Sequence, residues 1–295
     1  MIDTATLMKQ VGRIRILTSR LVDERMSGEY HSVFRGQGIE FDEVREYIPG
    51  DDIRTIDWNV TARMGHPFIK RYAEERELTV LFLVDISGSQ CFGSGARSKA
   101  ELAAELACLL ALSAIRNQDK VGLILFSDRI DLCLPPRKGR TSVMRIVREV
   151  LAAGSTRRGT DIAGALRFLN RIQKKKSVIF LISDFQDDRY MKELRITARK
   201  HDLVCCPVSD PREQELPNVG LVEIQDPETG ALFLADTAAD ECRAAFRAQA
   251  EASQAALKSA FLKYGIDSVF LSTERPIADD IMRLFRLREI RIGRR

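Results

Sequence analysis

The fold is decided by the stretch from Leu78 to Ser89, which reads LTVLFLVDISGS. A nearly unbroken apolar run of this kind predicts a strand that is buried on both faces of a parallel sheet. The run ends at Asp85, and Ser87 and Ser89 follow, so three oxygen-bearing side chains come at the carboxyl end of the strand. Ligands bind at that edge in open α/β sheets, and oxygen ligands suit a small hard cation such as Mg²⁺.

The 295 residues are enough for one large α/β domain and a smaller appendage. A composition of 45% hydrophobic and 30% charged residues is typical of a soluble globular protein. The net charge of +4 does not by itself predict nucleic-acid binding, and we expect none. No apolar run reaches the roughly 18 residues of a membrane helix, and the first residues lack a signal-peptide core. We therefore expect a cytoplasmic protein without a membrane span.

From residue 77 onward, apolar strands such as Ser177–Ser183 alternate with helical patterns. This alternation predicts a doubly wound, mostly parallel α/β sheet over residues 77–295. One strand, Ile130–Leu134, is expected to run antiparallel and to end at the Pro-Pro pair that follows it. Residues 1–76 are predicted to form a separate N-terminal lobe, with a helix and then a mostly β segment.

Two further turns are predicted at the same edge of the sheet. Gly159 gives backbone freedom before Thr160 and Asp161, which open a helix, and Asp184 follows the second central strand. Each of these residues alone could merely cap a helix or form a turn. Together they predict a cation site built from three turns, with the candidate metal residues Asp85, Ser87, Ser89, Thr160 and Asp184.

This pattern resembles the metal-ion-dependent adhesion site of von Willebrand factor A domains, over about residues 78–290. The resemblance implies a Rossmann-like A-domain fold and a bound Mg²⁺, Mn²⁺ or Ca²⁺. It also implies that Ser87, Ser89 and Thr160 touch the cation, whereas Asp85 and Asp184 act largely through water or from behind the direct ligands. Phe185 is a departure, because that family usually has Gly after the second aspartate.

A second resemblance concerns residues 38–63, GIEFDEVREYIPGDDIRTIDWNVTAR. This segment resembles the signature of a bacterial family catalogued as domain of unknown function fifty-eight, whose members resemble partners of MoxR-type AAA+ ATPases. The resemblance implies an adaptor or co-chaperone of such an ATPase. The candidate partner-binding residues are Glu40, Asp42, Arg45, Asp51, Asp52, Arg54, Asp57, Trp58, Arg157 and Arg158.

Two other interpretations of the segment remain open at this point. It could be structural, with Trp58 in the core of the lobe and the charges paired to nearby arginines. Alternatively, one of its carboxylates could occupy the open position at the metal in cis.

The predicted ligands favour binding over catalysis. Three neutral hydroxyls and two carboxylates that act from outside the direct ligands only partly offset a dication, so a partner's Glu or Asp is expected to supply a further oxygen. Hydrolysis would need a positioned base, and none of His31, His66 and His201 falls in the three turns. We therefore expect a non-enzymatic, metal-dependent interaction protein. The alternative is a metal-dependent phosphohydrolase in which Arg157 and Arg158 clamp a phosphate.

Overall fold

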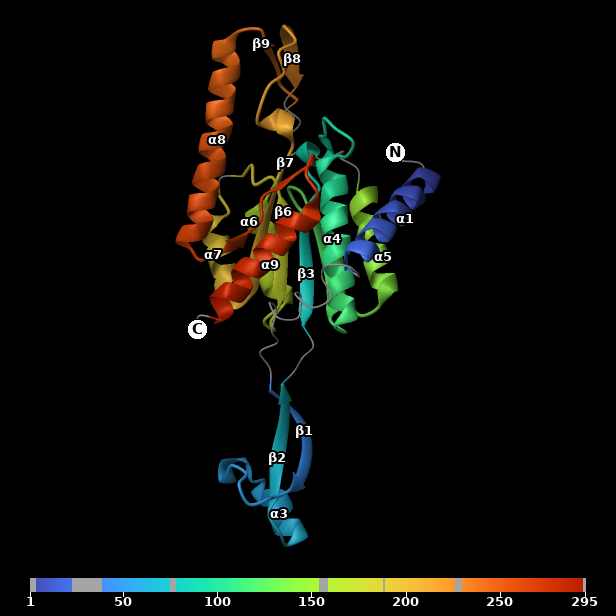
Figure 1. Cartoon of the computed structure of the whole chain (residues 1–295), viewed down its shortest axis with the longest axis vertical. Coiled ribbons are helices and arrows are strands. Elements are labelled where there is room, and N and C mark those ends of the chain that lie inside the picture. Colours follow the sequence, from blue (N-terminus) through green and yellow to red (C-terminus); the bar gives the residue numbers. More distant parts are fainter. Residues whose placement is uncertain are drawn as a thin grey trace. The chain divides into compact units, whose positions relative to one another are not determined.

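The computed structural model describes residues 4–22, 39–74, 78–153, 159–187, 189–225 and 230–293. The chain divides into two compact units, which we call the small unit (Arg35–Leu78) and the large unit (Met1–Phe34 with Thr79–Arg295). Figure 1 draws both units, and each is described here by itself.

The N-terminal helix α1 (Thr4–Leu21) belongs to the large unit, not to the lobe that the sequence predicted over residues 1–76. The reason is packing against α4 (Lys99–Arg116): Val11 and Ile14 are buried, and Thr18 Oγ1 lies 3.2 Å from Cys108 Sγ on α4. The apolar face of α1 is therefore part of the core of the large unit.

The large unit contains a mostly parallel sheet of seven strands within the described residues. The strand order is β10-β7-β6-β3-β4-β5, and β11 also pairs with β7. Every pair is parallel except β4 with β5. The strands are β3 (Thr79–Asp85), β4 (Lys120–Phe126), β5 (Ile130–Arg137), β6 (Val178–Ser183), β7 (Asp202–Ser209), β10 (Asp267–Ser268) and β11 (Leu271–Ser272). This architecture confirms a mixed α/β fold, whereas the doubly wound arrangement stays a prediction.

Strand β3 lies at the point of the sheet where the strand order reverses. It pairs with β4 on one side and with β6 on the other, so the chain leaves β3 in one direction and later returns to its opposite side. Such a reversal of strand order opens a crevice at the carboxyl ends of the strands. The turns after β3 and β6 therefore lie next to each other at that edge.

Helices lie against the sheet of the large unit (Figure 1). Leu81 and Leu83 of β3 share a core cluster with residues of α6 (Ile162–Ile172) and α7 (Met191–Lys200), and with Phe261 of α8 (Asp240–Lys263). Helix α4 contacts β3 and β4 and begins with a capping box formed by Ser98 and Glu101. The part of the large unit that the structure describes also contains α5 (Arg140–Ala152) and α9 (Ile277–Gly293). No helix among the described residues is both long enough and apolar enough to span a bilayer.

The edge strand β5 is longer than the sequence predicted. It continues through Pro135 and Pro136 to Arg137, although the proline pair was expected to end it. Proline lacks an N–H donor and is tolerated on edge strands, where one side of the backbone has no ladder to complete. Among the named strands, β5 pairs only with β4, which explains the difference.

The small unit combines a hairpin with a short helix. Strands β1 (Ile39–Glu46) and β2 (Phe68–Glu74) pair antiparallel, with an irregularity in register between Phe41 and Glu43. Between them lie the 3-10 turn η2 (Ile53–Thr55) and helix α3 (Trp58–Met64). Strands β1 and β2 therefore form the β part of the lobe that the sequence predicted.

A second hairpin, β8 (Leu221–Gln225) with β9 (Leu232–Asp236), precedes α8 in the large unit. Its large apolar side chains are unusually exposed, including Leu221, Phe233 and Leu234 at 59–74%. Exposed apolar surface of this kind is uncommon on a monomer.

His201 gives the large unit a titratable group in its interior. The side chain ends α7, is buried, and neither ring nitrogen has a hydrogen-bond partner among the described residues. Burial, followed by the charge of Lys200, lowers the pKa of His201 below its ordinary value. Below about pH 6.5 the unfolded chain binds a proton that the folded chain binds less readily, so His201 makes stability fall as the pH falls. Urea denaturation at pH 7.5 and 5.0 is expected to show a smaller loss in His201→Leu than in the wild type.

Candidate functional site

The turn after β3 is built around a buried carboxylate. Asp85 ends the strand, and its Oδ1 accepts a hydrogen bond of 2.9 Å from the backbone N–H of Ser87. Ser87 leads into the 3-10 turn η3 (Gly88–Cys91), which brings the Ser87 and Ser89 hydroxyl oxygens to 3.2 Å from each other. All three side chains are buried, so a carboxylate and two hydroxyls are held together away from bulk water.

The end of β6 is tied directly to this turn. Ser183 donates a hydrogen bond of 2.6 Å from its hydroxyl to Asp85 Oδ2 and accepts one of 3.0 Å from the N–H of Phe185. Sequence reasoning missed Ser183. Its position just before Asp184, on the strand beside β3, was the available signal.

Asp184 brings a second carboxylate close to the first. Burial raises the pKa of Asp85 to about 7, and the nearby negative charge of Asp184 adds to the rise. The hydrogen bonds from Ser183 and Ser87 oppose it only in part. Two carboxylates in a buried site repel each other, and an added positive charge relieves that repulsion.

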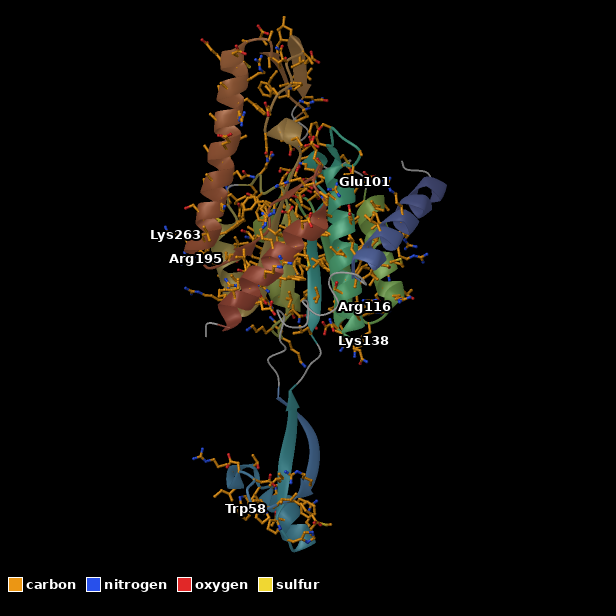
Figure 2. All side chains as sticks on the ribbon, in the orientation of Figure 1. Trp58, Glu101, Arg116, Lys138, Arg195 and Lys263 are labelled. Carbon is orange, nitrogen blue, oxygen red and sulfur yellow. The ribbon has the colours of Figure 1, made fainter. Side chains whose placement is uncertain are left out.

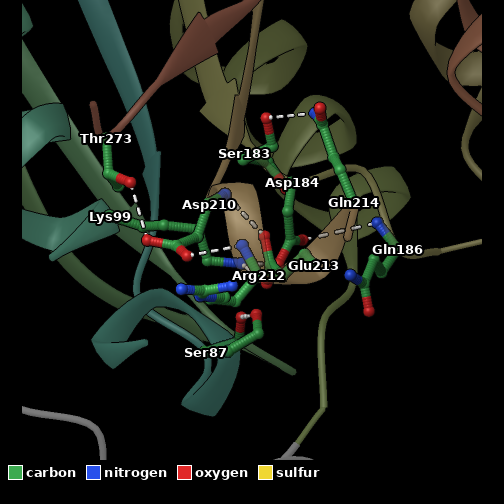
Figure 3. A network of polar contacts seen from close by, with 12 residues as sticks. Ser87, Lys99, Ser183, Asp184, Gln186, Asp210, Arg212, Glu213, Gln214 and Thr273 are labelled. Atoms are coloured by element: carbon green, nitrogen blue, oxygen red, sulfur yellow. Dashed lines mark hydrogen bonds and ion pairs between the residues drawn. The ribbon is translucent and has the colours of Figure 1, made fainter. Parts of the chain in front are cut away.

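A lysine already supplies part of this positive charge. Lys99, the first residue of α4, has a fully buried side chain whose Nζ lies 2.9 Å from Asp184 Oδ2 and 2.6 Å from Glu213 Oε1. Burial acts to lower the pKa of Lys99, but the charges of Asp184 and Glu213 outweigh it and the pKa is raised. Figure 3 shows this network. Sequence reasoning missed Lys99, because a lysine in the first turn of a helix normally lies in solvent.

Glu213 is positioned by Asp210, a buried carboxylate after β7. Asp210 accepts hydrogen bonds from the Ser94 N–H at 3.0 Å and the Ser94 hydroxyl at 2.5 Å. It also accepts one from the Thr273 hydroxyl at 2.6 Å (Figure 3). It also caps the 3-10 turn η4 (Pro211–Glu213) through the N–H of Arg212 at 2.9 Å. The loop after Ser89 and the turn that carries Glu213 are thus held together.

Thr160 lies on a turn that the structure ties to the same edge. Gly159 before it has a positive φ of 89°, and the Asp161 N–H donates to the carbonyl of Ser127, just after β4, at 2.8 Å. The N–H of Ile162 donates to Asp187, in the turn after β6, at 3.1 Å. The turn of Thr160 is therefore bonded to residues that follow β4 and β6, the two neighbours of β3.

Phe185, where A domains usually have Gly, keeps the backbone shape of a glycine. Its φ is 60°, a conformation that side chains rarely adopt. The ring packs against Tyr190 and Phe261, at centroid distances of 5.6 and 5.4 Å. Aromatic packing in the core accounts for a bulky residue at a strained position, so the departure leaves the turn of Asp184 in place.

Some candidate partner-binding residues of the small unit bond within the unit, whereas others are exposed. The first group consists of three aspartates. Asp51 receives a two-pronged ion pair from Arg45, at 2.9 and 2.7 Å, and Asp52 caps η2 through the N–H of Arg54. Asp57 is buried and caps α3 by accepting from two backbone N–H groups. These three aspartates therefore stabilise the local fold.

Trp58 is 70% exposed at the start of α3, so the interpretation of this residue as core is wrong (Figure 2). The helix begins there because Asp57 caps it, and no residue of α3 is buried. Arg54 is also exposed. Glu40 and Asp42 lie on β1, whereas Arg157 and Arg158 lie outside the described residues.

The donors at the edge of the sheet fit a hard cation. Over the ranges that the structure describes, no group of three or more His, Cys, Asp or Glu side chains is placed to hold a metal ion. The donors here are instead serine hydroxyls beside two carboxylates, which is oxygen chemistry of the kind that Mg²⁺ and Ca²⁺ prefer. The buried repulsion between Asp85 and Asp184 is the feature that such an ion would relieve.

One comparison with known proteins identifies a family, and another identifies relatives. A family model described as "Protein of unknown function DUF58" matches residues 43–256. The chain is 31% identical over 288 residues to an uncharacterized protein, Rv1480, of Mycobacterium tuberculosis. The match covers 96% of this chain and 90% of the relative.

The solved structures to which the chain is similar include a conserved hypothetical protein, BatB, from Bacteroides thetaiotaomicron. It is 18% identical, with a TM-score of 0.45, and the match covers 71% of this chain and 99% of that chain. The SpRpn10 VWA domain is 12% identical, with a TM-score of 0.34, and the match covers 45% of this chain and 76% of that chain.

Proposed function

Because the chain belongs to the family described as a protein of unknown function, DUF58, we propose a function from its site: a non-enzymatic, divalent-cation-dependent protein-interaction module. One observation carries the proposal. Ser87 and Ser89 hold their hydroxyls 3.2 Å apart, beside an Asp85 carboxylate that is hydrogen-bonded to Ser183 of the neighbouring strand. The arrangement joins oxygen donors from two separate turns at the ligand-binding edge of the sheet.

In this proposal Ser87, Ser89 and Thr160 hold a cation directly, and Asp85 and Asp184 hold it through water. A dication bound there supplies an electron-poor centre with a position open to an acidic side chain of another protein. The residues of the chain hold the oxygen donors in position. Asp85 fixes the Ser87 turn, Ser183 fixes the Asp85 carboxylate, and burial protects these bonds from competition with water.

The small unit offers a second surface for a partner. It exposes Ile48, Ile53, Trp58 and Met64, which are 57–70% accessible, and among its described side chains Ile69 is the one buried hydrophobic residue. Trp is over-represented among residues that dominate binding energy at interfaces. The partner that we propose, from the resemblance of the signature over residues 38–63, is a MoxR-type AAA+ ATPase.

The test measures cation binding and partner capture separately. The purified chain is titrated with Mn²⁺ and followed by electron paramagnetic resonance, and the immobilised chain is incubated with a purified MoxR-type ATPase in Mg²⁺ or in EDTA. We expect saturable Mn²⁺ binding and capture of the ATPase in Mg²⁺ only. Capture that is equal in EDTA would contradict the cation-dependent part of the proposal, and absence of capture in both buffers would remove the partner.

A further inference from the structure

Lys99 is the buried charge of the site that the proposed function does not use. Its side chain is 0% exposed, although lysine is almost never fully buried unless it is paired. It starts α4, so it lies on the same loop-to-helix connection that begins with Ser87 and Ser89. An ammonium group without compensation would be very unfavourable there, and Asp184 and Glu213 provide the compensation.

With a cation bound, the Asp184 carboxylate would interact with two positive charges, the ammonium of Lys99 and the cation itself. Its Oδ2 lies 2.9 Å from Lys99 Nζ, and its Oδ1 accepts a long hydrogen bond of 3.4 Å from the N–H of Gln186. Asp184 directly follows Ser183, whose hydroxyl donates to Asp85 Oδ2 at 2.6 Å, so Asp184 stands at the edge of the hydroxyl and carboxylate cluster as well. A divalent cation in that cluster and the ammonium of Lys99 would therefore compete for the negative charge of the Asp184 carboxylate.

Glu213 keeps Lys99 paired with a carboxylate even if Asp184 turns away from the lysine. It pairs with Lys99 at 2.6 Å, and its turn is fixed by the four hydrogen bonds that Asp210 accepts. If Asp184 moves toward a cation, Lys99 keeps a carboxylate partner and is not left as an unpaired buried charge. The geometry thus supplies one carboxylate that can be shared and one that stays with the lysine.

We propose that Lys99 is a built-in counter-cation that stabilises the metal-free site and weakens the binding of a divalent cation to it. This inference rests on the proposed function, because it concerns the same cation. It assigns a role to Lys99 and Glu213 that neither resemblance implies: they set how tightly the cation is held. A site tuned in this way releases its cation readily and with it any partner bound through the cation.

The test compares wild type with Lys99→Met, which keeps much of the length of the side chain and removes its charge. Without divalent cations we expect the thermal midpoint of Lys99→Met to fall by roughly 10 °C, because two carboxylates lose their shared partner. Its dissociation constant for Mn²⁺, measured by electron paramagnetic resonance, is expected to decrease at least about tenfold, since a unit charge a few ångströms away no longer repels the ion. Added Mg²⁺ then raises its midpoint more than that of the wild type.

Arg288→Met is the matched control. Arg288 is a buried cation that pairs with Asp202 and Asp267 near β7 and β10, and it is not part of the site network. Its loss is expected to lower the thermal midpoint as well, but without any change in Mn²⁺ affinity and without extra recovery in Mg²⁺. The control separates the general effect of stranding buried carboxylates from the specific effect at the site.

A second pair of variants covers the case in which Lys99→Met does not fold without cations. Lys99→Met/Glu213→Gln removes one of the two stranded carboxylates and is compared with Glu213→Gln alone. The double variant is expected to bind Mn²⁺ at least about tenfold more tightly than the single one. Equal or weaker binding in either comparison overturns the role of Lys99 while leaving the proposed function standing. If neither wild type nor variants bind Mn²⁺ at millimolar concentration, both proposals fail.

Discussion

Asp85→Asn is expected to lose at least about 100-fold in Mn²⁺ affinity and yet to fold at least as stably as the wild type at pH 7.5 without divalent cations. The asparagine can still accept from the N–H of Ser87 and meet the hydroxyl of Ser183, so the turn keeps its shape. It no longer carries the negative charge that a dication needs at this position.

The expected gain in stability follows from the sign of the pKa shift. Burial and the charge of Asp184 raise the pKa of Asp85 to about 7, so at pH 7.5 the folded chain holds a carboxylate that is easier to ionise in the unfolded chain. The shift from 3.8 corresponds to a cost of up to about 4 kcal/mol. Removing that charge removes the cost. Urea denaturation gives the stability, and Mn²⁺ titration gives the affinity.

Asp267→Asn is the matched control, because the pKa of Asp267 is shifted in the opposite direction to that of Asp85. The burial of Asp267 acts to raise its pKa, but hydrogen bonds and charges from Arg291 and Arg288 outweigh it and the pKa is lowered. Its carboxylate therefore stabilises the fold above its unfolded pKa of about 4. The variant is expected to lose stability at pH 7.5 and to keep its Mn²⁺ affinity. A destabilised Asp85→Asn with unchanged affinity would mean that Asp85 is only structural.

These contrasting aspartates show which parts of the site could be predicted from the sequence. Asp85, Ser87, Ser89 and Asp184 follow two apolar strands that are buried along nearly their whole length, and parallel strands bring their carboxyl ends to one edge. The pattern of apolar runs was therefore sufficient to predict where these side chains gather.

The sequence could not predict the charges that complete the site. Lys99 and Glu213 are separated by 114 positions, and their ion pair depends on the turn that Asp210 fixes after β7. Nothing in a local pattern distinguishes a lysine that is buried in the first turn of a helix from one in solvent. Pairing between distant loops is a property of tertiary packing, so Lys99, Glu213 and Asp210 could only be identified from the structure.

Trp58 is a residue for which the sequence left two interpretations open. It was a candidate partner-binding residue, and the alternative was a core position, since burial of a large aromatic ring is strongly favourable. The structure leaves the ring in solvent: η2 and α3 contain no buried residue, and Trp58 is 70% exposed. The exposed ring is the reason to expect a binding role in place of a structural one.

Trp58→Ser is accordingly expected to weaken capture of the ATPase by about 30-fold or more, equivalent to about 2 kcal/mol, without unfolding the small unit. Stability should change little, since the ring is already in solvent and Asp57 still caps α3. Mn²⁺ affinity should not change, because the cation residues belong to the large unit. Partner affinity is measured by titrating the labelled chain with the purified ATPase.

Leu234→Ser provides the control for a general loss of exposed apolar surface. Leu234 on β9 is 74% exposed, so the two substitutions remove side chains of similar accessibility from different units. If the Trp58 surface binds the partner, only Trp58→Ser weakens capture, and Asp85→Asn weakens it independently by removing the cation. Equal effects of Trp58→Ser and Leu234→Ser would argue against a specific surface on the small unit. An effect of Leu234→Ser alone would move the partner-binding surface to the β8–β9 hairpin.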